Sequence, residues 1–139
     1  MSPWRDARGA EIPLETFDRI AREAYAALPV AFRNLCGNIV VHTAEESEPK
    51  LLQEMGIDDP LDLSGLFEGV AVTEAGVTDP MALPNHVHLY RRSILAEWRE
   101  HGDIQLKDLI THVLVHEIGH HFGLSDDDMH RIEDEATDR

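Results

Sequence analysis

Hydrophobic residues recur at helical spacing in several parts of this chain. Between residues 14 and 28 they stand three or four positions apart, at Phe17, Ile20, Ala21, Ala24 and Leu28. This spacing predicts an amphipathic helix. Pro29 ends that helix and can begin a second, shorter one, because proline fits the first turn of a helix but not its interior. The same reasoning predicts further helices over 49–55, 93–100 and about 125–136.

Three short segments have the composition of β-strands, rich in β-branched residues and bounded by glycine or proline. They are residues 37–42, part of 63–72, and 86–90. Residues 73–85 are predicted to form a long loop. Few strands among several helices indicate an α+β domain, in which helices pack on one face of a small mixed sheet of three or four strands. A length of 139 residues suits a single domain over 1–139.

The longest helix is predicted over residues 104–122, with Asp103 as its N-terminal cap. His116 and His120 lie at the margin of its apolar surface. Packing of that surface into the core would fix the rotamers of both histidines, as a metal site requires. The apolar residues of the arc are Leu106, Leu109, Ile110, Val113, Leu114 and Ile118.

Both histidines belong to the run His116-Glu117-Ile118-Gly119-His120. Residues four apart lie on the same face of a helix, so both imidazoles can reach one metal ion. Glu117 lies about 100° around the helix axis from His116, where it can contact water at that ion. Two neutral histidines, Zn²⁺ and a neighbouring carboxylate are the groups that activate water for hydrolysis. The sequence therefore predicts His116 and His120 as zinc ligands and Glu117 as the catalytic base.

A third protein ligand is expected, because catalytic zinc usually has three and leaves one position to water. Gly123 can adopt the left-handed conformation that ends a helix, after which the chain turns back and presents Asp126. Asp126 is therefore the predicted third ligand. An acidic residue at this point also suits the N-terminus of the last helix. His130 and Glu133 on that helix are rival ligands.

The full string, His116-Glu117-x-x-His120-x-x-Gly123-x-x-Asp126, resembles the extended metzincin signature, with Asp where His is more usual. In size and setting the chain is similar to the small bacterial minimal zincins, a family of metallopeptidases. The resemblance is specific over 116–126 and looser over 63–126. It implies a zinc-dependent peptidase acting on a peptide or protein substrate, in which Glu117 passes a water proton to the leaving amine. Metzincins have a Met-containing turn further downstream, and the only methionine after this motif is Met129.

The resemblance also implies a place for the substrate. Zincins have a strand beside the cleft that pairs with an extended peptide. In this chain the segment 65–72 or the strand 86–90 would have that role.

Two other functions fit the same residues. A family of bacterial zinc-dependent ribonucleases also has a His-x-x-x-His helix followed by glycine and a third histidine, but it lacks the glutamate that stands here as Glu117. The formal net charge of −15 also disfavours a nucleic-acid partner. The other possibility is a zinc-binding interaction domain without catalysis.

Composition bears on the compartment. The chain has one cysteine, Cys36, so it cannot form an intramolecular disulfide. This composition favours a reducing compartment. No run of apolar residues is long enough to span a membrane. We therefore expect a soluble, cytoplasmic protein that has no membrane partner.

Histidines outside the motif have less specific interpretations. His112 lies one turn before the motif and is expected to be a neighbour of the site rather than a ligand. His86 and His88 lie two apart on a predicted strand, so they share one face, and we expect that face to be exposed to solvent. His42 is expected to be structural.

Overall fold

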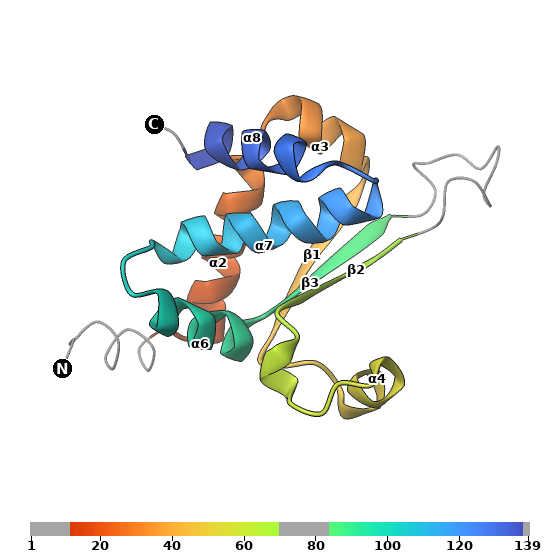
Figure 1. The fold of residues 1–139 in the computed structure, drawn as a ribbon, viewed down its shortest axis with the longest axis vertical. Coiled ribbons are helices and arrows are strands. Elements are labelled where there is room, and N and C mark those ends of the chain that lie inside the picture. Colours follow the sequence, from red (N-terminus) through yellow and green to blue (C-terminus); the bar gives the residue numbers. More distant parts are fainter. Residues whose placement is uncertain (1–11, 70–83, 138–139) are drawn as a thin grey trace.

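The computed structural model describes residues 12–69 and 84–137 (Figure 1). Its helices are α2 (Leu14–Ala26), α3 (Val30–Cys36), α4 (Pro49–Met55), α6 (Arg91–His101), α7 (Leu106–His121) and α8 (Asp126–Thr137), and a short 3₁₀ helix, η2, spans Pro60–Asp62. The strands are β1 (Ile39–Ala44), β2 (Gly65–Glu68) and β3 (Asn85–Tyr90). Most of the loop predicted at 73–85, and the end of the strand predicted within 63–72, lie outside the described residues. Within the described residues, no helix has the length and apolar character that a bilayer crossing requires.

The three strands form a mixed sheet in the order β1-β3-β2. β1 runs parallel to β3, with Val41 opposite Val87, and β2 runs antiparallel to β3, with Gly65 opposite Leu89. A parallel pair such as β1 and β3 needs a long connection between its two strands. Strand β2 is the edge strand that lies nearest to α7. The α+β architecture with a small mixed sheet is therefore confirmed.

Helices α2 and α7 pack against one face of the sheet, and α8 runs back alongside α7 (Figure 1). The sheet contributes Val41, Val87 and Leu89 to this main core. Each fully buried apolar side chain of this size stabilises the fold by roughly 1.5–3 kcal/mol. The whole apolar arc predicted for α7 is buried in this core, at Leu106, Leu109, Ile110, Val113, Leu114 and Ile118. The amphipathic pattern thus places the motif helix at the centre of the molecule.

The start of α7 differs from the prediction. The helix begins at Leu106, and Gln105 before it is extended (φ −74°, ψ 144°). Asp103 is therefore not its N-terminal cap. The Asp103 N–H donates to the His101 carbonyl at 2.9 Å, and the Trp98 indole donates to the Ile104 carbonyl at 2.7 Å. Both bonds hold residues 103 and 104 against the end of α6. The first turn of α7 therefore begins after these residues in the chain.

The opposite face of the sheet is only partly covered. Around α4, Leu52, Leu63 and Tyr90 form a small second apolar cluster. The remainder of this face carries polar side chains from all three strands. The described sheet thus has one face in the core and one face whose side chains are mostly partly exposed, an arrangement common in antiparallel sheets.

Candidate metal centre and active site

The turn after the motif has the geometry that its glycine predicted. Gly123 lies in the left-handed region, with φ 75°. Its N–H donates to the His120 carbonyl at 3.2 Å, and the Leu124 N–H donates to the Gly119 carbonyl at 2.9 Å. These bonds satisfy carbonyls that the end of α7 would otherwise leave unpaired. The chain therefore reverses directly after the motif, and α8 packs back on α7.

Asp126 lies in the first turn of α8 and its side chain is exposed. The cap of this helix is the residue before it, because the Ser125 hydroxyl accepts the Asp128 N–H at 3.1 Å. Asp126 is therefore not needed as a capping side chain. Its carboxylate remains available for another role at the end of the motif.

Gly119, inside the motif, is a point of close approach between α7 and α8. Met129 of α8 is fully buried. A Cβ atom at position 119 would lie 2.6 Å from the Met129 Sδ and 2.9 Å from its Cγ. Only a residue without a side chain allows this approach. Met129 thus packs against the turn of α7 that carries both motif histidines.

The two motif histidines lie one helical turn apart at the edge of α7. Their ring centroids are 5.7 Å apart, and the ring planes are almost perpendicular, at 86°. The His116 side chain is only 23% exposed, whereas His120 is exposed. Burial lowers the pKa of His116 below its usual range, and the neighbouring His112 lowers it further. A lowered pKa favours the neutral ring, which is the form that binds metal.

Glu117 lies on the side of α7 that faces β2. A Cβ atom at Gly65 would lie 3.2 Å from the Glu117 Cγ and 3.0 Å from the Val113 Cγ1. Glycine in the edge strand therefore lets β2 lie directly against the motif helix. Burial raises the pKa of the Glu117 carboxyl, and His120 partly opposes that effect. A carboxyl whose pKa is raised towards neutrality is suited to proton transfer.

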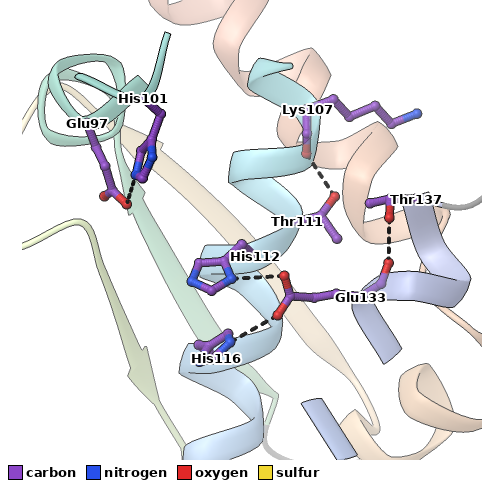
Figure 2. A network of polar contacts seen from close by, with 8 residues as sticks. All are labelled: Glu97, His101, Lys107, Thr111, His112, His116, Glu133 and Thr137. Atoms are coloured by element: carbon purple, nitrogen blue, oxygen red, sulfur yellow. Dashed lines mark hydrogen bonds and ion pairs between the residues drawn. The ribbon is translucent and has the colours of Figure 1, made fainter. Parts of the chain in front are cut away.

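Glu133 of α8 contacts two histidines of α7 (Figure 2). Its Oε1 lies 2.9 Å from the His112 Nδ1, and its Oε2 lies 3.0 Å from the His116 Nε2. Across residues 12–69 and 84–137, this is the one group of three or more His, Cys, Asp or Glu side chains whose ligand atoms all lie within 4.8 Å of one another. Two imidazoles and a carboxylate are donors that zinc accepts. The chemistry of the site therefore fits a zinc ion.

The group of His112, His116 and Glu133 shares only His116 with the predicted set of zinc ligands. His120 and Asp126 stand outside it. Sequence reasoning named Glu133 as a rival ligand and His112 as a neighbour, and both lie beside His116. The four-residue spacing of the histidines at 112, 116 and 120 is the signal that places His112 on this face. The contact from Glu133 depends on how α8 packs on α7. The periodicity of residues within one helix carries no information about that packing.

Comparison with known proteins identifies the family of this chain. A family model described as zincin-like metallopeptidase matches residues 36–136. That range includes the sheet, the motif helix and nearly all of α8, and it covers well over half of the chain. The chain belongs to the zincin-like metallopeptidase family. No curated protein matches it.

Membership in the zincin-like family confirms the resemblance drawn from the motif. It implies a divalent metal, typically zinc, and a metallopeptidase in general terms. For this zincin-like chain, the group formed by His112, His116 and Glu133 is a candidate place for that metal.

Proposed function

We propose that this zincin-like chain is a zinc-dependent peptidase that hydrolyses peptide bonds, with Glu117 as the general base. The position of Glu117 carries this proposal. Its side chain stands on the motif helix between two histidines in sequence and lies against the edge strand at Gly65. A base in that place is next to both the metal-binding side chains and a strand that can hold a peptide.

His116 and His120 are the proposed zinc ligands, with Asp126 as the third. A zinc ion held there would polarise a peptide carbonyl and ease the ionisation of water. Glu117 then accepts the proton of the attacking water and delivers it to the nitrogen of the leaving amine. Its partly buried position supports this role, since a raised pKa makes the carboxylate a better proton acceptor.

Strand β2 is the proposed binding edge for the substrate. It is an edge strand of the described sheet and is antiparallel to β3, so an extended peptide can add to it through backbone hydrogen bonds. Phe67 of β2 packs on His121 of α7, with ring centroids 4.2 Å apart. Together with the contact at Gly65, this holds the strand beside the motif helix.

A peptide or protein is the proposed substrate rather than a nucleic acid. The formal net charge of −15 opposes contact with a phosphate backbone. The glutamate between the two histidines also separates this motif from that of the zinc-dependent ribonucleases. The cytoplasm is the proposed location, because a single cysteine, Cys36, favours a reducing compartment.

Glu133 is the alternative third ligand, and one contact favours it. Its Oε2 lies 3.0 Å from the His116 Nε2, and two ligand atoms on the same zinc ion are separated by a similar distance. The motif spacing and the left-handed Gly123 favour Asp126 instead. Substitution of each carboxylate, with zinc content as the readout, distinguishes the two ligands.

The test compares wild type with Glu117→Gln, using casein and a random peptide library as substrates. Gln matches Glu in shape but cannot accept the proton. We expect unchanged zinc content by elemental analysis and a loss of cleavage of at least about 10²-fold, since a positioned general base contributes roughly 10²–10⁴. Glu100→Gln, an exposed glutamate of α6, is the matched control and should cleave like wild type. Equal cleavage by wild type and Glu117→Gln would refute the mechanism. Full zinc without any cleavage by wild type would favour a binding domain.

A further inference from the structure

The sheet face opposite the main core carries a second group of imidazoles. Side chains alternate along a strand, and Val41 and Val87 point into the main core. The alternate residues His42, His86 and His88 therefore project from the opposite face, and each is partly exposed. Helix α4 and its small apolar cluster cover another part of this face.

The strand register brings these histidines together. His42 of β1 stands opposite His88 of β3, and their rings stack with centroids 4.6 Å apart. The His42 Nε2 also lies 2.9 Å from the His86 Nδ1. From β2, the Glu68 Oε1 lies 2.7 Å from the His88 Nε2. These four side chains, contributed by all three strands, are called here the sheet histidine cluster.

We propose that the sheet histidine cluster is a second metal site, which binds a divalent transition-metal ion such as Zn²⁺. Imidazole and carboxylate are the donors that such ions accept, and three histidines with one further donor complete a tetrahedral site. Two histidines at positions i and i+2 of one strand, with a third directly across on the next strand, direct three imidazoles to one side of a sheet. This is the arrangement of His86, His88 and His42.

No three ligand atoms of this cluster lie within 4.8 Å of one another, so metal binding here requires side-chain adjustments. A neutral imidazole has one N–H and one lone pair, so the bond between His42 and His86 uses one proton between two ring nitrogens. If the donor ring moves its proton to its other nitrogen, both facing nitrogens can bind an ion. His88 becomes the third ligand by turning its ring away from Glu68. The Glu68 carboxylate is 58% exposed and can follow as the fourth donor.

The sheet histidine cluster shares no residue with the motif site. Helix α7 packs on the other face of the sheet, so the two groups of histidines are separated by the sheet itself. The proposal therefore stands independently of the proposed peptidase activity. A chain that cleaves no peptide can still bind zinc at this cluster, and the reverse also holds.

The first experiment isolates this cluster by removing the motif site with His116→Ala and His120→Ala. Calorimetric titration of the full chain with Zn²⁺ should then show one remaining equivalent. Adding His42→Gln and His88→Gln should weaken that binding at least about tenfold, which is the lower end of what the loss of a supporting residue costs a metal site. His101→Gln is the matched control, because this histidine of α6 pairs with Glu97 outside both clusters. It should bind zinc like the parent protein.

The second experiment uses the wild-type chain, so it does not depend on the folding of any variant. Excess Zn²⁺ should shift the imidazole NMR signals of His42, His86 and His88, in addition to those of the motif. The proposal is overturned if these three signals stay in place in excess zinc. It is equally overturned if the His42→Gln and His88→Gln substitutions leave zinc binding unchanged, or if His101→Gln weakens binding as much as they do.

Discussion

Two carboxylates of α8, Asp126 and Glu133, have different surroundings beside the motif. Asp126 is exposed in the first turn of the helix. Glu133 is partly buried and held between His112 and His116. A side chain already fixed by two partners is suited to orient a metal ligand, and such supporting residues typically change metal affinity by about 10–100-fold. A side chain that is itself a ligand has a larger effect, because two remaining donors rarely hold zinc.

We therefore expect Asp126→Ala to lose bound zinc almost completely and Glu133→Gln to retain more of it. The measurement is zinc per chain by elemental analysis after dialysis against a weak chelator. Asp127→Ala, the adjacent exposed acid of the same helical turn, is the control and should keep its zinc. The opposite order, with zinc kept by Asp126→Ala and lost by Glu133→Gln, would assign the third ligand to Glu133.

At the scale of secondary-structure elements, the site depends on how closely α8 approaches α7. The contact is made where the fully buried Met129 meets Gly119. The same approach brings Glu133 to His116. The glycine inside the motif therefore has a packing role in addition to its place between the two motif histidines.

Gly119→Ala should destabilise the protein by about 1–3 kcal/mol, because the added methyl group overpacks the contact with Met129. Unfolding in urea measures this change. In a Met129→Ala background the same substitution should cost less, since the shorter side chain removes the clash. An equal cost of Gly119→Ala in both backgrounds would contradict this account of the helix contact.

At the scale of the whole molecule, a metal bound at the proposed motif site would link folding to zinc. The proposed ligands come from α7 and from the start of α8, two elements that are brought together only in the folded chain. A ligand that binds only the native state stabilises it by about 4 kcal/mol at a free concentration of 1,000 times its Kd. Zinc should therefore contribute substantially to the stability of this domain.

Removing zinc with a chelator should lower the thermal unfolding midpoint of the wild-type chain. The variant that carries both His116→Ala and His120→Ala should lose most of that response, because the motif site is absent. Calorimetry with and without the chelator measures both shifts. An equal decrease in the two proteins would mean that the stabilising zinc binds elsewhere, with the sheet histidine cluster as the first place to examine.

Local patterns in the sequence determined the elements and the motif. Periodic apolar residues predicted α7 and its buried arc, and Gly123 predicted the left-handed turn that follows it. These features depend on neighbours within one or two turns, and local backbone preferences and side-chain periodicity act over that range. The pattern at 116–126 also indicated the family to which the chain belongs, because a motif of residue types at fixed spacing can be read from the local sequence.

The tertiary structure decided which distant side chains meet. Glu133 reaches His116 because α8 runs back along α7 from the close contact at Gly119, and Gly65 allows β2 to lie against Glu117. Asp103 suited a helix cap by its residue type, but bonds to α6 kept the start of α7 later in the chain. His42 was expected to be structural, and the parallel pairing of β1 with β3 decided that its neighbour is His88. Such contacts arise from packing between elements far apart in the chain, and periodicity within one element carries no information about them.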